Sequence, residues 1–94
     1  MTDIPELTER DFARMIPMDR LRRLRSGHFT AKDIAALRKY LSLSQRDLAE
    51  RLGISIDTLQ NWEQDRTAPD GPARALIAII ARHPTIITRG ELPV

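Results

Sequence analysis

The fold is decided by residues 43–66, which read LSQRDLAERLGISIDTLQNWEQDR. Ser44 has the short hydroxyl side chain that commonly caps the start of a helix, and apolar residues at helical spacing follow it. Gly53 then supplies a residue that adopts the left-handed conformation without steric cost, as a tight stop after a helix requires. Ser55 can cap the next helix in the same way. The stretch therefore predicts two helices joined by a sharp turn, a pair that can set its second helix into the major groove of DNA.

On each side of this pair the sequence predicts a further helix. Thr30 and Asp33 have the spacing of a capping box, and apolar residues at helical spacing follow them. After a loop rich in proline, Pro72 suits the first turn of another helix, which Pro84 ends because the residue before a proline is pushed out of helical geometry. Residues 85–88 are expected to form a short extended piece. We predict an all-α bundle of four to five helices with an N-terminal arm.

The composition is that of a small globular protein with 94 residues, a mass of 10.7 kDa and a formal net charge of +2. Cysteine is absent and the two histidines are far apart in sequence, so we expect no disulfide, no metal site and no cofactor. No nucleophile–base pair or phosphate loop stands out, so we predict no catalytic residue and no enzyme. The longest apolar run, residues 75–81, is too short to span a bilayer, and we expect a cytoplasmic protein without membrane contact.

Residues 30–83 resemble the helix-turn-helix superfamily that includes phage lambda-type repressors and bacterial xenobiotic-response-element regulators. Within it they resemble the antitoxins of HigBA-type toxin–antitoxin operons and the similar NadS-type regulators. The resemblance implies a lambda-repressor-like fold, and an antitoxin that neutralises a messenger-RNA-cleaving toxin and represses its own operon as a dimer. Four motifs carry the resemblance to the superfamily: Leu43-Ser-Gln, Leu48-Ala, Leu52-Gly-Ile-Ser and Asn61-Trp-Glu. The resemblance to the antitoxins rests on residues 58–64, 69–76 and 81–84.

The resemblance also implies which residues contact double-stranded operator DNA. Asparagine and glutamine amides can pair with adenine, and isoleucine can contact a thymine methyl group. The expected base contacts are Ile56, Asp57, Gln60 and Asn61. The expected phosphate contacts are Gln45, Arg46, Ser55, Thr58 and Arg66, with Lys39 as a weaker candidate.

Several of these residues also have a purely structural interpretation. The Asp57 carboxylate either accepts a hydrogen bond from cytosine or, as we favour, stabilises the positive end of its own helix. Gln45 can be a solvated helix start, and Arg46 can pair with a neighbouring acid on an exposed face. Arg66 can satisfy a nearby helix end. Trp62 is better explained as a core residue than as a stacking platform for single-stranded nucleic acid.

The helix expected over residues 71–82 is apolar on more faces than one core requires. A homodimer interface is the natural use of the second apolar face, and two copies would read a palindromic operator with half-sites about 34 Å apart. The alternative is that the tail, residues 84–94, folds back over this face. The candidate dimer contacts are Ala75, Ile79, Ile86 and Ile87.

Residues 1–29 form the expected arm, in which an acidic stretch precedes an arginine-rich one. Residues 1–13 carry four carboxylates against Arg10, and residues 14–25 carry five arginines against Asp19. The arm is either partly ordered on its own or orders on a partner. By analogy with the operon type we predict that it holds the cognate toxin. The candidate toxin contacts are Phe12, Met15, Ile16, Leu21 and Leu24.

Two other functions remain open beside the antitoxin. One is a stand-alone helix-turn-helix repressor without a toxin partner. The other is an interaction adaptor that has lost DNA binding. The acidic Asp57 and the low net charge favour this adaptor.

Overall fold

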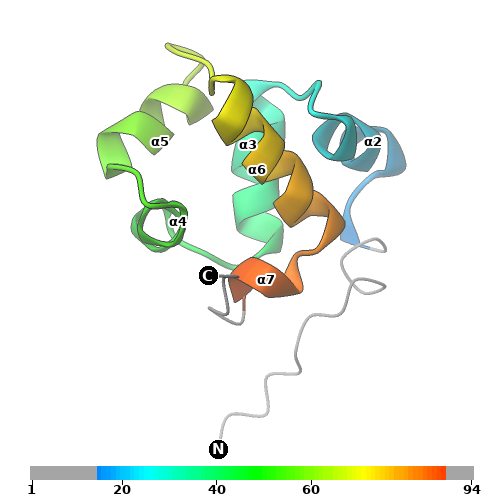
Figure 1. Ribbon diagram of the computed structural model, residues 1–94. Coiled ribbons are helices and arrows are strands. Elements are labelled where there is room, and N and C mark those ends of the chain that lie inside the picture. The colour runs from blue at the N-terminus through cyan, green and yellow to red at the C-terminus, as the bar shows by residue number, and fades with distance from the viewer. Residues whose placement is uncertain (1–14, 89–94) are drawn as a thin grey trace, which may run out of the picture.

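Six helices form most of residues 15–88, the part of the chain that the computed structural model describes, and no strand lies among these residues (Figure 1). The all-helical secondary structure of these residues confirms the predicted all-α bundle. Helices α2 and α7 add to the four helices that the sequence marks clearly. The helices are α2 (Met18–Ser26), α3 (Ala31–Tyr40), α4 (Gln45–Leu52), α5 (Ile56–Glu63), α6 (Gly71–Arg82) and α7 (Thr85–Thr88).

The predicted helix starts are confirmed by their capping hydrogen bonds. Ser44, Ser55 and Asp70 each accept the backbone N–H of the third residue after them, at 3.0, 3.1 and 3.0 Å. Thr30 does the same, and Asp33 in return accepts the N–H of Thr30 at 2.9 Å. These bonds satisfy N–H groups that have no partner inside their own helix. The local sequence therefore sets where four of the helices begin.

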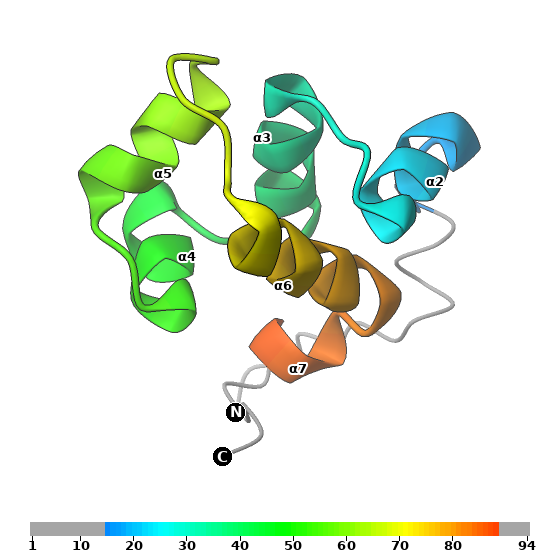
Figure 2. The ribbon, with the colours of Figure 1, turned by 45° about the horizontal axis from the view of Figure 1, so that its top comes forward.

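Helix α3 is the centre of the bundle. In both views α2 lies on one side of α3 and the α4–α5 pair lies on the other, while α6 runs across them (Figures 1 and 2). Helix α6 contacts α2 and α7, and α3 contacts α2 and α5. Within residues 15–88 no helix is both long and apolar enough to cross a bilayer.

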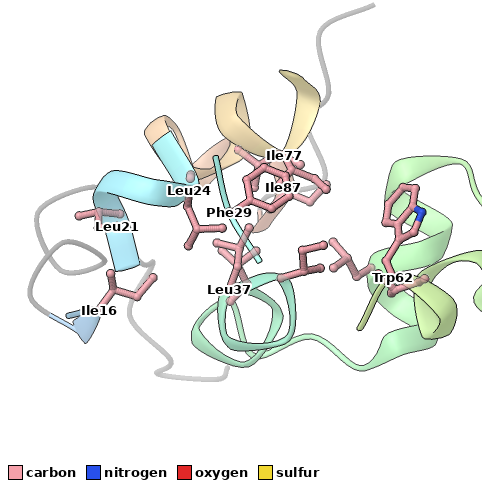
Figure 3. Close-up of a cluster of buried hydrophobic side chains, with 14 of the residues drawn as sticks. Ile16, Leu21, Leu24, Phe29, Leu37, Trp62, Ile77 and Ile87 are labelled. Atoms are coloured by element: carbon pink, nitrogen blue, oxygen red, sulfur yellow. The ribbon is translucent and has the colours of Figure 1, made fainter. Parts of the chain in front are cut away.

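One largely aliphatic core, which also includes Phe29 and Trp62, runs through all of these helices. Figure 3 shows Ile16 and Leu21 at one end of the core and Trp62 at the other. Leu24, Leu59 and Ile87 have side chains with no exposed surface. Fully burying one such side chain stabilises a fold by about 1.5–3 kcal/mol, so the residues that reach the core contribute strongly to stability.

The structure corrects the predicted domain boundaries. The sequence suggested an arm over residues 1–29, a domain over residues 30–83 and a tail over residues 84–94. Helix α2 instead packs on α3 and α6, because Leu21 and Leu24 stand three residues apart on one face of a helix. Residues 85–88 form a helical turn that buries Ile87, not an extended piece. A single core therefore extends from residue 16 to residue 87.

A buried carboxylate fastens α2 to the start of α3. Asp33, which has no exposed surface, accepts Arg20 Nε at 3.0 Å and both Nε and Nη2 of Arg23 at 2.8 Å. Burial alone would raise the pKa of Asp33. The hydrogen bonds from Arg23, from the Thr30 N–H and from Arg20 outweigh burial and hold that pKa well below its usual range. The sequence pattern predicted only the capping role of Asp33.

Two further arginines tie α6 to the end of α2. Arg74 donates to the carbonyl oxygen of Gly27 at 2.9 Å, and its guanidinium lies 4.7 Å from the centre of the Phe29 ring. Arg82 donates to the carbonyl oxygen of Arg25 at 2.8 Å. Both arginines thus satisfy carbonyl groups at a helix end, where intrahelical partners are lacking. Helix α2 is held by polar contacts as well as by its leucines.

Candidate nucleic-acid interface

Helices α4 and α5 meet at a tight turn. Gly53 has a φ of 73°, in the left-handed region that suits glycine, and the Ile54 N–H donates to the carbonyl oxygen of Ala49 at 3.0 Å. Ala49 is 2% exposed and Leu59 fully buried where the two helices pack together. The turn leaves the first turn of each helix at the protein surface, with Ser44 and Ser55 exposed as their caps.

A chain of polar side chains connects α3, α4 and α5. Arg38 binds Glu63 through two hydrogen bonds, Nε to Oε2 at 2.8 Å and Nη2 to Oε1 at 3.0 Å. Gln45 donates from Nε2 to Glu63 Oε1 at 3.2 Å, and its Oε1 accepts Nε2 of Gln60 at 3.2 Å. The Glu63 side chain is 6% exposed and that of Arg38 is 15% exposed. This network fixes the direction in which the Gln45 amide points.

The four expected base contacts lie in the first two turns of α5. Asp57 is exposed, while Ile56, Gln60 and Asn61 are half-buried. Ile56 also packs partly against the core, so only part of its side chain faces outward. Gln60 uses one of its two amide protons for Gln45, which leaves its carbonyl oxygen and second proton outside that bond. The first two turns of α5 can therefore present amide and apolar groups together to a groove of DNA.

The expected phosphate contacts surround this surface. Gln45 and Arg46 lie in the first turn of α4, and Arg46 is exposed. Ser55 Oγ lies 2.9 Å from Thr58 Oγ1 at the start of α5. Arg66 is exposed in the loop after α5. The backbone folds back there, since the Arg66 N–H donates to the carbonyl oxygen of Asn61 at 2.9 Å.

The structure decides one of the open alternatives, that for Trp62. Trp62 is 7% exposed and belongs to the core cluster, which confirms its interpretation as a core residue. Asp65 has a φ of 61°, so the chain leaves α5 through a residue in the left-handed conformation. Arg51 donates to the carbonyl oxygen of Ile87 and so joins α4 to α7.

Burial corrects one of the four expected dimer contacts, Ile87, and leaves the other three exposed or half-buried. Ala75 and Ile79 are exposed on α6, with Ile79 at 43%, and Ile86 is half-buried. Ile87 has no exposed surface, so its side chain cannot also contact a second copy. Leu76, an α6 residue that is 38% exposed, was not among the expected dimer contacts.

The same correction applies to the expected toxin contacts. Ile16, Leu21 and Leu24 are at most 4% exposed, because they pack in the core of this chain. Met15 is 44% exposed and Phe12 lies outside the described residues. The sequence analysis missed Met18, which is 56% exposed and close to Met15 in sequence.

Part of the chain that forms this interface is similar to known proteins. The helix-turn-helix family matches residues 34–73. Antitoxin HigA-2 from Vibrio cholerae serotype O1 is 36% identical over 56 residues, which are 60% of this chain and 54% of the relative. The chain thus spans about half the length of that relative. No solved structure gives a significant match.

These matches confirm the resemblance of residues 30–83 to helix-turn-helix regulators and to HigA-type antitoxins. The matched region begins in α3 and ends in α6, so it includes the turn at Gly53 and the polar start of α5. Residues 34–73 therefore match the helix-turn-helix family, and over 56 residues the chain is similar to Antitoxin HigA-2.

Proposed function

We propose that this chain is a DNA-binding antitoxin that represses its own operon as a dimer and neutralises a cognate toxin. The observation that supports DNA binding is the α4–α5 pair, whose second helix begins with exposed and half-buried polar side chains beside Gln45. The 36% identity to Antitoxin HigA-2 supports the antitoxin half of the proposal.

In this function α5 lies in the major groove and α4 crosses the DNA backbone. Asn61 pairs with an adenine, and Gln60 can do so with the amide groups that its bond to Gln45 leaves over. Ile56 contacts a thymine methyl group. Asp57, in the first turn of α5, stabilises the positive end of that helix.

Phosphate groups on both sides of the groove contact the residues around α5. Gln45 and Arg46, at the start of α4, contact phosphates of one DNA strand. The phosphate contacts around α5 come from Ser55, Thr58 and Arg66. A net charge of only +2 gives little bulk attraction to DNA, so binding depends on these placed contacts. Each phosphate that is neutralised releases counterions, and the operator affinity therefore falls as salt rises.

Dimerisation uses the outer face of α6. Ala75, Leu76 and Ile79 are exposed there, and Leu76 also borders a hollow of about 280 Å³ beside Leu52 and Ile54. A second copy would remove this apolar surface from water. A two-fold arrangement gives two α5 helices that read a palindromic operator in successive major grooves. Ile86, at the start of α7, lies at the edge of the same interface.

Replacing Asn61 by alanine is expected to cost about 1–3 kcal/mol of operator binding and to relax sequence preference, because a base-reading amide is lost. Arg46→Ala is the matched control, since Arg46 is exposed on α4 and loss of a phosphate contact weakens binding to all sequences alike. Fluorescence anisotropy titrations with the native promoter and with a random duplex measure the affinity and the sequence preference of each variant. Equal losses on the two duplexes for Asn61→Ala would contradict its role, and no salt-sensitive binding by the unmodified chain would favour the adaptor.

Deleting residues 1–14 is expected to leave operator binding intact and to abolish co-elution with the toxin encoded beside this chain. The deletion stops before Ile16, because a longer one would remove Leu21 and Leu24 from the core. Size-exclusion chromatography of the co-expressed pair measures toxin binding. A Phe12→Asp variant tests the same segment at full length. Toxin that still co-elutes with both variants would refute this assignment.

A stand-alone repressor without a toxin is the second candidate. It is favoured by the burial of Ile16, Leu21 and Leu24, which assigns three of the five expected toxin contacts to the fold itself. Under this function the full-length chain binds its operator with the same salt dependence but co-purifies with no neighbouring gene product.

A further inference from the structure

A basic hollow lies where α2 packs beside α3, away from the α6 interface and from the α5 residues expected to read bases. Of its lining residues only Lys39 was a candidate DNA contact, the weaker one to phosphate. Its volume is about 360 Å³. Alanine methyl groups and a tyrosine ring supply its apolar surface, and three of its six lining residues are cationic while none is acidic. The lining residues are Arg20, Lys32, Ala35, Ala36, Lys39 and Tyr40.

The positive charge of this hollow is poorly compensated. Arg20 and Arg23 share the carboxylate of Asp33, and Arg23 also lies 3.9 Å from the exposed carboxylate of Asp19. Lys32 and Lys39 are exposed on α3, and among residues 15–88 neither lies within ion-pair distance of a carboxylate. Lys32, Ala36 and Tyr40 stand four residues apart, so they share one face of α3. The hollow thus offers an apolar floor with cations around it.

The N-terminal segment of this same chain has the complementary chemistry. Residues 1–14 carry four carboxylates against Arg10 and Arg14, interleaved with Ile4, Leu7 and Phe12. The segment leads into α2 at Met18, two residues before Arg20, which lines the hollow. Fourteen extended residues reach about 46–50 Å, so this tether spans the hollow easily. A short tether also gives its end a local concentration in the millimolar range.

We propose that residues 1–14 dock into the α2–α3 hollow in the free chain. Their carboxylates lie beside Lys32 and Lys39, and their apolar side chains cover Ala35, Ala36 and Tyr40. The apolar floor favours this segment over a DNA phosphate backbone, which has no apolar groups to place there. The inference concerns the chain without DNA or toxin, and so it goes beyond the proposed function and does not depend on it.

Docking would have a consequence for any partner of the segment. The partner binds only the undocked fraction, so its apparent affinity falls by that fraction. The hollow would also shield Ile4, Leu7 and Phe12 from non-specific contacts while the partner is absent. Release from the α2–α3 hollow is therefore a step that precedes capture.

A spin label on the segment tests the docking directly. The chain has no cysteine, so a Thr2→Cys variant takes one nitroxide label at one position. In the full-length ¹⁵N-labelled protein we expect selective paramagnetic broadening of the amides of Ala36 and Lys39. The broadening should weaken at 1 M salt, where the Debye length is about 3 Å. Uniform broadening, or broadening only on α6, would overturn the proposal.

Charge reversal supplies the matched comparison. Lys32→Glu and Lys39→Glu should each reduce the broadening toward the level of the reduced, diamagnetic label, whereas Arg22→Glu, an exposed site on α2, should not. Glu6→Gln with Glu9→Gln alters the segment and leaves the described fold untouched, and it should give the same loss. Unchanged broadening in the lysine variants would overturn the proposal. Broadening that arises only between labelled and unlabelled copies would also overturn it.

Discussion

Replacing Glu63 by alanine is expected to lower the free energy of unfolding by about 3–5 kcal/mol, the usual cost of removing one partner from a buried ion pair. The side chains of Glu63 and Arg38 are only 6% and 15% exposed, so the guanidinium left behind cannot recover full hydration. Gln45 would lose the acceptor that orients its amide. Operator affinity should therefore fall even at temperatures where the variant remains folded. Urea unfolding and anisotropy titration measure the two effects separately.

A double substitution separates the charge from the packing at this site. Arg38→Met with Glu63→Leu removes both charges and keeps apolar volume, and buried pairs replaced in this way are often neutral or stabilising. The double variant should thus recover most of the stability that Glu63→Ala loses, but not the operator affinity, because Gln45 still lacks its acceptor. Equal instability of the single and double variants would mean that the Arg38–Glu63 ion pair is not what makes Glu63 important.

The helix-turn-helix itself could be predicted because its signals are local. Ser44, Gly53 and Ser55 each act on backbone groups within a few residues of themselves, and such capping rules hold in nearly any context. The correct placement of Trp62 in the core followed from its spacing to Leu59. The residues of α5 that face outward follow from the same helical spacing once the buried face is known.

The contacts that the sequence could not predict join residues far apart in the chain. Arg38 and Glu63 are 25 residues apart, and no local pattern distinguishes their pair from two solvated charges. Leu21 and Leu24 look the same whether a helix packs on its own chain or on a partner. The sequence assigned these leucines to a partner, whereas α6 provides the surface that buries them here. Asp33 was recognised as a cap, but its two arginines come from a helix whose docking was not foreseen.

Replacing Asp33 by asparagine is expected to cost about 2–4 kcal/mol of stability at pH 7, somewhat less than for a fully buried pair. The expected cost is lower than for a fully buried pair because the Arg20 and Arg23 side chains are 30% and 39% exposed and can turn toward water. The folded chain holds the pKa of Asp33 below its usual range, so on acidification the unfolded chain takes up the proton first. The stabilisation from Asp33 is thus fully present above about pH 4 and is lost as the pH falls further.

Urea titrations at pH 7 and near pH 2.5 test this dependence. The stability difference between the unmodified chain and Asp33→Asn should shrink at the lower pH, and Asp19→Asn should change stability little, because Asp19 is 82% exposed and 3.9 Å from Arg23. An Asp33→Asn difference that is the same at both pH values would contradict the origin assigned to it. Asp33 also sets the place of Arg20 at the α2–α3 hollow. Loosening α2 should therefore reduce the proposed docking of residues 1–14 as well. The Asp33 carboxylate would then contribute both to the stability of the fold and to the docking of the N-terminal segment.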